Sequence, residues 1–278
     1  MPISFSAILK RALLTFLLPF LLSACAGEKP VRLTETEASL FQARWKTAEH
    51  LAEYDRLSRI AADTLTDCLD SILSAGISGW VVVPNGISAQ RVLFGSMKED
   101  SLLCDFEVRI APEENQWQRH TPPITLSGTE ARLFAAREIA FKANQNRLTR
   151  LGISFNSYAW EEGDSVTVYF MPGALKGRAM VGGGIRCRVT ESTVQTTQLH
   201  PGLSAIRIEP DTYGIRYDSP KDSIINEADI AQYLIGKTSL PNRRITTPKY
   251  CFQLSYQPET GKDSILVFPA KHKAGNQD

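Results

Sequence analysis

Residues 153–171 decide the fold class, because they read ISFNSYAW, then EEGD, then SVTVYFM. The two outer segments are rich in β-branched and aromatic residues, which favour strands. Between them Gly163 and Asp164 favour a turn. A connection this short joins antiparallel strands, since parallel strands need a long crossover. The stretch therefore predicts a β-hairpin in the second half of the chain.

Helical periodicity precedes this hairpin. Ser127-Gly128-Thr129-Glu130 is a capping box, and apolar residues recur on one face as far as about Asn144. A second capping box, Thr34 to Glu37, opens a stretch without Gly or Pro that reaches Ala75. About 40 helical residues would span about 60 Å, so we expect either a break or a projecting N-terminal portion.

In the rest of the chain, apolar and polar residues alternate with period two in short segments that are bounded by turn residues. This pattern predicts an α+β fold, with a long N-terminal helix, then a mainly antiparallel sheet packed against a second helix at 128–144. The predicted organisation is a helix with a small β-hairpin region at 34–111, an α+β domain at 124–270 and a loose tail at 271–278. Strands are expected at 80–83, 91–94, 102–110, 179–190, 194–200, 204–208, 250–256 and 264–268, polar loops at 112–123 and 211–223, and a short helix at 226–236.

The N-terminus has the order of parts found in secretory signals. Lys10 and Arg11 precede the uncharged run ALLTFLLPFLL at 12–22, which is too short to span a bilayer. Leu22-Ser23-Ala24-Cys25 follows and resembles the lipobox of bacterial lipoproteins. The resemblance implies a signal peptide at 1–24, lipidation of Cys25 and a lipid-anchored tether at 25–33. An ordinary cleavage site before a chance Cys is the alternative.

The resemblance also implies a location. In the enteric sorting rule of this family, Asp after the lipidated Cys retains the protein in the inner membrane. Ala26 stands there in this chain. We therefore expect an outer-membrane protein that faces the periplasm.

Charge and composition exclude several classes of protein. There are 31 Lys and Arg against 30 Asp and Glu, and the net charge is +1. Nucleic-acid binding needs a basic surplus, so no nucleic-acid partner is expected. A mean hydropathy of −0.17 excludes a polytopic membrane protein. We expect the protein to contact the membrane only through its lipid anchor.

Four cysteines remain besides Cys25. An oxidising periplasm favours two disulfides, and we expect Cys68–Cys104 and Cys187–Cys251, the pairs nearest in sequence. Other connectivities and four free buried thiols are the alternatives. No C-x-x-C occurs and no Cys lies near a His, so no metal site is expected.

The middle of the second half contains the most unusual local sequence, Gly182-Gly183-Gly184. Three glycines form either a bulge or bend, or a site where an anion or ligand approaches the backbone closely. Arg186 and Arg188 then share one strand face, which is either a basic patch together with Arg207 or a solvated face. Gly236-Lys237-Thr238 lacks the first glycine of a P-loop, so no nucleotide and no cofactor are expected.

Catalytic motifs are absent from the sequence. There is no G-x-S-x-G or H-E-x-x-H, and of four scattered histidines only His200 ends an apolar strand. The sequence therefore favours a structural, adaptor or binding protein over an enzyme. Its partner would be another envelope protein or a polymer, bound through the projecting helix or a sheet edge. Trp80, Trp117 and Trp160 are candidates for a sugar- or peptide-binding surface.

Two other functions stay open. One is a periplasmic hydrolase in which a cleft joins His200 to a Ser or Asp, walled by Gly182–Gly184. The other is a carrier with an apolar pocket for a small ligand between sheet and helix.

Overall fold

The computed structural model describes residues 29–270, apart from 69, 71–74, 86–88, 99–100, 151, 174, 192, 201, 210–211 and 220. Cys25, the predicted signal peptide at 1–24 and the predicted tail at 271–278 lie outside these residues, as do residues 25–28 of the predicted tether.

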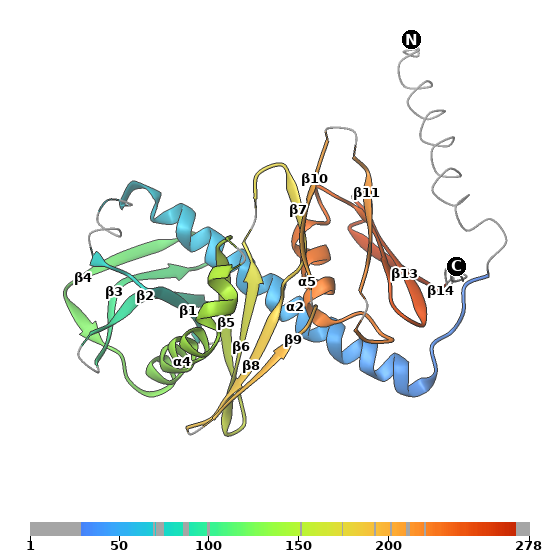
Figure 1. The fold of residues 1–278 in the computed structure, drawn as a ribbon. Helices are drawn as coiled ribbons and strands as arrows, with labels where there is room; N and C mark the ends of the chain where they lie inside the picture. Colours follow the sequence, from blue (N-terminus) through green and yellow to red (C-terminus); the bar gives the residue numbers. More distant parts are fainter. Residues whose placement is uncertain are drawn as a thin grey trace, which may run out of the picture.

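The described chain has an α+β fold, as the sequence predicts (Figure 1). Its strands form three four-stranded sheets, in the orders β1-β2-β3-β4, β5-β6-β8-β9 and β11-β12-β13-β14, and one β10-β7 pair. All of these pairings are antiparallel except that of β11 with β12. The elements are α2 (Glu35–Thr64), η2 (Thr66–Cys68), β1 (Gly79–Asn85), β2 (Ala89–Lys98), β3 (Ser101–Ile110), β4 (Gln116–Thr125), α4 (Gly128–Arg150), β5 (Phe155–Glu162), β6 (Ser165–Pro172), β7 (Arg178–Gly182), β8 (Ile185–Val189), β9 (Val194–Gln198), β10 (Leu203–Arg207), β11 (Gly214–Asp218), α5 (Glu227–Gly236), β12 (Asn242–Thr246), β13 (Tyr250–Gln257) and β14 (Lys262–Pro269).

Helix α2 begins at the predicted capping box. The Thr34 hydroxyl accepts from the Glu37 N–H, and the Glu37 carboxylate accepts from the Thr34 N–H. The α-helix ends at Thr64, and the single turn η2 follows, so the long helix is broken as expected.

The expectation of a projecting N-terminal portion is wrong. Phe41 stacks on Phe252 of β13 with 5.7 Å between ring centroids, and Arg44 donates to Asp222 at 2.7 Å. The helix also contacts α5 and strands β1, β2, β3 and β5. Helix α2 therefore runs along the described fold and packs against elements from both halves of the chain (Figure 1).

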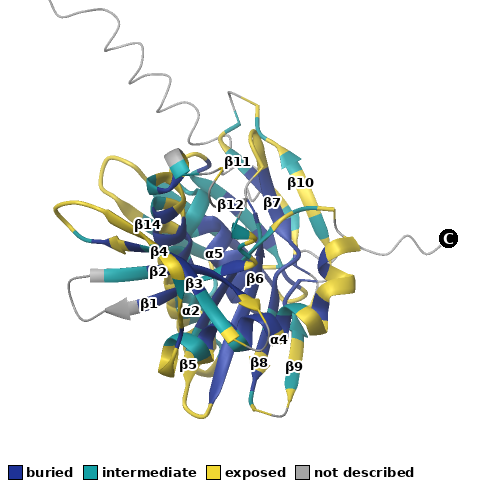
Figure 2. Cartoon of the chain, turned by 90° about the vertical axis from the view of Figure 1, so that its left-hand side faces the viewer, coloured by how far each residue is buried: buried dark blue, intermediate teal, exposed yellow. Residues whose placement is uncertain are grey.

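The β1-β2-β3-β4 and β5-β6-β8-β9 sheets form one layer between helices α2 and α4. One hydrophobic cluster joins α2 to one face of both sheets, and a second joins α4 to the opposite faces. In the first cluster lie Leu51, Leu57, Val92, Phe106, Tyr158 and Tyr169; in the second lie Leu133, Phe134, Val81, Leu93, Ala159 and Val168. Because both faces are covered, β6 is buried along nearly all of its length (Figure 2).

The layer is interrupted where its two sheets meet. Strand β1 is the edge of one sheet and β5 is the edge of the other. The two strands are neighbours in space, but no ladder joins them among the described residues. This junction leaves two sheet edges facing each other in the middle of the molecule.

Two segments expected to be loops contain strands. Strand β4 occupies the predicted polar loop at 112–123, and β11 lies inside the predicted loop at 211–223. The sequence signal failed at β4 because its residues are mostly exposed and include Pro122 and Pro123, which an edge strand tolerates. Strand β12 was not expected at all.

Candidate functional site

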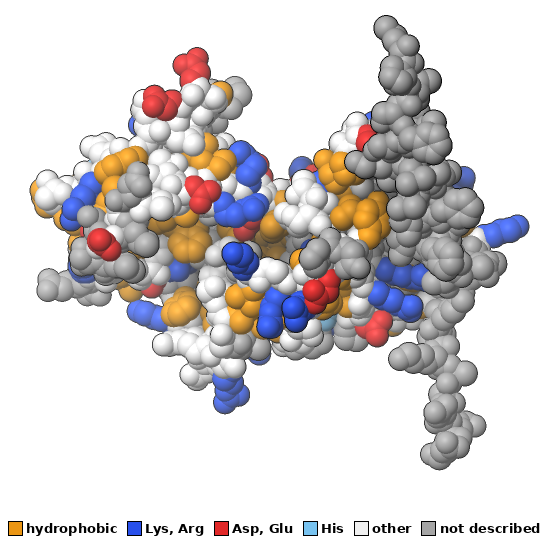
Figure 3. Space-filling model, turned by 90° about the horizontal axis from the view of Figure 1, so that it is seen from above, with side chains coloured by type: hydrophobic (Ala, Val, Ile, Leu, Met, Phe, Trp, Pro, Cys, Tyr) orange, Lys and Arg blue, Asp and Glu red, His pale blue; other side chains and the backbone are white. Residues whose placement is uncertain are grey.

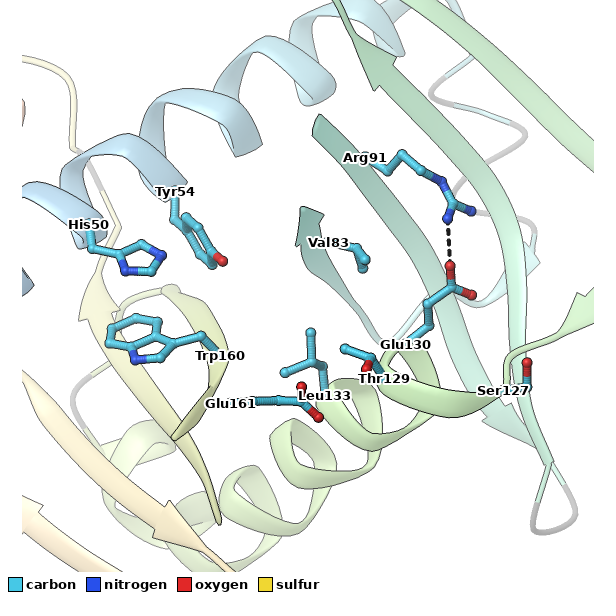
Figure 4. A pocket seen from close by; sticks show the side chains of 10 residues that line it. All are labelled: His50, Tyr54, Val83, Arg91, Ser127, Thr129, Glu130, Leu133, Trp160 and Glu161. Atoms are coloured by element: carbon cyan, nitrogen blue, oxygen red, sulfur yellow. Dashed lines mark hydrogen bonds and ion pairs between the residues drawn. The ribbon is translucent and has the colours of Figure 1, made fainter. Parts of the chain in front are cut away.

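A groove hollows the described surface at the junction of the two sheets. It has a volume of about 680 Å³ and opens to solvent. Strands β1, β2 and β5 and helices α2 and α4 all contribute side chains to it (Figure 4). Its lining consists of His50, Tyr54, Val83, Arg91, Ser127, Thr129, Glu130, Leu133, Trp160 and Glu161.

One end of the groove is aromatic. The His50 ring stacks on Trp160 with 4.6 Å between centroids and an interplanar angle of 14°. Trp160 stacks in turn on buried Tyr169 at 5.1 Å, and Tyr54 meets both His50 and Trp160 edge-on. Trp160 is held further by donating its indole N–H to Glu162 at 2.9 Å. This end is therefore a rigid stack whose outermost ring, His50, is exposed.

Burial changes the titration of both α2 aromatics at this end. Packing against Trp160 and Tyr54 removes part of the water around the His50 ring, and this partial desolvation lowers its pKa below 6.5 although the residue as a whole stays exposed. Burial raises the pKa of Tyr54 to about 12. At neutral pH the two rings are uncharged and present apolar surface together with hydrogen-bonding atoms.

The other end of the groove is charged. Arg91 donates to Glu107 through Nε at 2.8 Å and through Nη2 at 2.9 Å, and to Glu130 through Nη1 at 2.5 Å. The paired guanidinium lowers the pKa of Glu107. Glu161, which follows Trp160 on β5, lies between the two ends and accepts from Arg132 at 3.0 Å (Figure 4). The carboxylates of the groove are thus positioned by arginines.

A buried arginine of α4 forms hydrogen bonds to both sides of the junction between the two sheets, beside the groove. Arg137 donates to the Ser78 carbonyl at 3.0 Å, next to β1, and to the Ser157 hydroxyl of β5 at 2.8 Å. It also pairs with Glu138. A Cβ at Gly79 would lie 2.0 Å from the guanidinium carbon, so a larger residue there would displace the Arg137 side chain. The two edges are joined here by side-chain bonds in place of a backbone ladder.

His200 lies in a different, sealed region. Its Nδ1 is 3.4 Å from both oxygens of the fully buried Asp229 carboxylate. That carboxylate also accepts from the Ser219 hydroxyl at 2.8 Å and from the Asn226 side chain at 2.7 Å. We call these four residues the His200 cluster.

The His200 cluster does not have the geometry of a hydrolase. The serine donates to the aspartate, whereas a nucleophile must bond to the histidine base. All four residues are buried among the described residues, so their side chains do not face solvent there. The structure does bring His200 together with Ser219 and Asp229, but it makes them a buried hydrogen-bond network under α5.

Gly182–Gly184 form the bend at which the chain leaves β7 for β8. Gly182 and Gly183 have φ of 77° and 75°, a region that favours glycine. A Cβ at Gly182 would lie 2.1 Å from the Gly202 carbonyl oxygen and 2.7 Å from the His200 ring. The expected single strand at 179–190 is therefore two strands in two sheets, and the glycines face protein atoms.

The predicted basic strand face has acidic partners. Arg186 donates to Glu227 at 2.9 Å, and Arg188 donates to Ser165 at 2.9 Å and lies 3.7 Å from Asp164. Arg207 is on β10, in a different sheet, and pairs with Glu209. These arginines do not form a shared anion site.

The predicted disulfides Cys68–Cys104 and Cys187–Cys251 are wrong for this structure, in which all four thiols are free. Cys104 and Cys187 lie in the cluster under α4, whereas Cys251 lies in β13 and accepts from Arg244. Residues adjacent in sequence order thus face different parts of the core. Burial raises the pKa of Cys104 to about 12 and also raises that of Cys187.

Sequence reasoning missed most of the groove. Trp160 was a candidate for a binding surface, but His50 was not, since it lies among charged residues of a helix. Arg91 and Glu130 are far apart in sequence, and no motif joins them. The capping box at Ser127 to Glu130 was visible, and its residues turn out to line the groove.

Metal-binding and membrane-spanning features are not found in the described part of the chain. Within residues 29–270, apart from the gaps given above, no three His, Cys, Asp or Glu side chains are grouped so that they could hold a metal ion. No described helix combines the length and the apolar character needed to cross a bilayer. Comparisons with family models, curated proteins and solved structures find no match for this chain.

Proposed function

We propose that this chain is a lipid-anchored binding protein of the bacterial outer membrane that faces the periplasm and uses the groove at the β1–β5 junction. The anchor is Cys25 of the lipobox-like sequence Leu22-Ser23-Ala24-Cys25. The partner is another component of the envelope, held without chemical conversion.

The groove is the observation that carries this proposal. A hollow of about 680 Å³ is of the size that binds small ligands. It combines an aromatic end with charged groups that are held in place by ion pairs, so little ordering is required on binding. On the face drawn in Figure 3, acidic and basic side chains are interspersed. This mixture argues against a partner that is attracted by a large surface patch of a single charge.

A binding role fits the chemistry of the groove better than a catalytic role does. His50, the only histidine in the lining, stacks on Trp160 and has no serine or cysteine as a hydrogen-bond partner among the described residues. The cluster that contains a serine, an aspartate and a histidine is sealed. The groove can hold and orient a ligand through these side chains.

The anchor is tested by labelling cells with an alkyne analogue of palmitate. The wild-type chain should be labelled and recovered in outer-membrane vesicles, and Cys25→Ala should lose the label and accumulate as precursor. Labelling of Cys25→Ala would contradict the anchor.

The groove is tested by placing a photo-crosslinking amino acid at Glu161 in intact cells. A matched probe at Glu113, an exposed acid outside the lining, is the control. A partner captured from position 161 and not from 113 supports the groove as the site. Equal capture from both positions, or capture from 113 alone, would contradict it.

A further inference from the structure

We propose that the ligand of the groove is an uncharged carbohydrate, a short oligosaccharide or a segment of a glycan chain. This inference rests on the proposed binding function and names the chemical class of its ligand.

The aromatic end offers the surface that a sugar ring needs. A pyranose has apolar C–H faces, which pack on flat rings whose edges carry polar atoms. His50 is exposed, lies parallel to Trp160 beneath it and is held edge-on by Tyr54. The stack keeps this ring in one orientation without a ligand, so a sugar would meet a preformed platform.

The cation of the charged end is already paired. Three of the five N–H donors of Arg91 donate to Glu107 or Glu130, so two carboxylates offset its charge. A phosphate or carboxylate ligand needs free donors, and it would also meet two carboxylates. Anionic ligands are therefore disfavoured at the groove.

The groove is rich in acceptors for hydroxyl groups. Glu130 and Glu161 each accept a hydrogen bond from an arginine, and a carboxylate has about four lone-pair sites. The hydroxyls of Ser127 and Thr129 lie in the same lining and can both donate and accept. A ligand with many O–H groups and apolar C–H faces satisfies both ends at once.

An extended peptide is the strongest rival, because two strand edges face the junction. Strand addition would use backbone groups of β1 or β5. The polar atoms of the lining described above are side-chain carboxylates and hydroxyls, and Arg137 already bridges the two edges. The groove therefore favours the carbohydrate.

The test is isothermal titration calorimetry of the purified full chain in detergent. The probes are tetra-N-acetylchitotetraose, maltotetraose, an uncharged extended octapeptide and inorganic phosphate. We expect one of the two oligosaccharides to bind without being cleaved, and phosphate and peptide not to bind. His50→Ala and Glu161→Gln should each weaken oligosaccharide binding at least 10-fold. Trp117→Ala, an exposed aromatic outside the lining, should leave it unchanged.

Each other outcome has a distinct meaning. Peptide or phosphate binding that His50→Ala abolishes, without oligosaccharide binding, overturns the carbohydrate and leaves the groove as a binding site. Oligosaccharide binding that is equal in wild type, His50→Ala and Glu161→Gln overturns the site assignment. No binding of any probe overturns the carbohydrate inference, and the in-cell crosslinking at Glu161 then decides the proposed function separately. Thermal melts of all variants show whether a loss of binding reflects unfolding.

Discussion

The groove and the His200 cluster contain similar residue types but differ in their access to solvent. Both bring a histidine, at least one carboxylate and a serine together from distant parts of the sequence. In the groove, His50 is exposed and the carboxylates face solvent-accessible arginines. In the His200 cluster, Asp229 is fully buried and all its neighbours are internal. The difference shows that composition does not distinguish a binding site from a structural network, whereas burial does.

The first prediction concerns the centre of the sealed region. Asp229→Ala should lower the free energy of unfolding by about 3 kcal/mol or more, because it leaves the buried Ser219 and Asn226 donors without their acceptor. Asp218→Ala, at an exposed neighbouring position, should change it by less than about 0.5 kcal/mol. Urea denaturation measures both. Equal midpoints for the two variants would show that the cluster does not support the fold.

The second prediction concerns the fastening of the sheet junction. Arg137→Met should cost about 3 kcal/mol, because Glu138 stays buried without its cation. Burial lowers the pKa of Arg137, which reflects the cost of charging it there. Adding Glu138→Met should restore part of the loss, because an apolar pair can replace a buried ion pair. A double-mutant cycle by denaturation checks this, and strictly additive losses would speak against the pair.

The third prediction compares two glycines of positive φ. Gly182→Ala should cost about 3 kcal/mol, from a left-handed backbone and from the clash with Gly202 and His200. Gly163→Ala has φ of 62° but no atom within 4 Å of its new Cβ, so it should cost only about 1 kcal/mol. The difference of about 2 kcal/mol in unfolding free energy measures how tightly the sealed region is packed. Equal losses of unfolding free energy for the two variants would mean that the residues around Gly182 can shift to accommodate the new methyl group.

The fourth and smallest prediction concerns the exposed histidine. The pKa of His50 lies below 6.5 in the folded chain, so between that value and 6.5 the unfolded state binds more protons. Stability should therefore rise slightly with pH across this window and fall on acidification. His50→Phe should remove this component. NMR titration of the His50 ring together with urea midpoints at two pH values checks it, and a midpoint at or above 6.5 for the ring would contradict the burial argument.

The helices and the central hairpin were predictable because their signals are local. The capping box at Thr34 is formed as predicted, and the residues between β5 and β6 make the expected tight turn. The strand β4 could not be recognised, since an edge strand exposed along its length shows no alternation of apolar residues.

The cysteine pairs show why distant contacts escaped prediction. Sequence order placed Cys187 with Cys251, but the bend at Gly182–Gly184 puts Cys187 in β8, which packs toward α4. The sheet that contains Cys251 belongs to another layer. No local rule encodes which face a strand presents after such a bend.

By itself, the sequence determined the α+β class, the starts of the helices, the antiparallel hairpins and the lipobox-like N-terminus. These depend on hydrogen bonds, backbone preferences and periodicities within a few residues. Only the tertiary structure decided that β1 and β5 meet without a ladder, that Arg91 is shared by Glu107 and Glu130, and that His50 lies on Trp160 while His200 is sealed. The reason is that exposure and long-range contact are set by how α2 and α4 cover the two faces of one interrupted β-layer, which no single segment of the chain specifies.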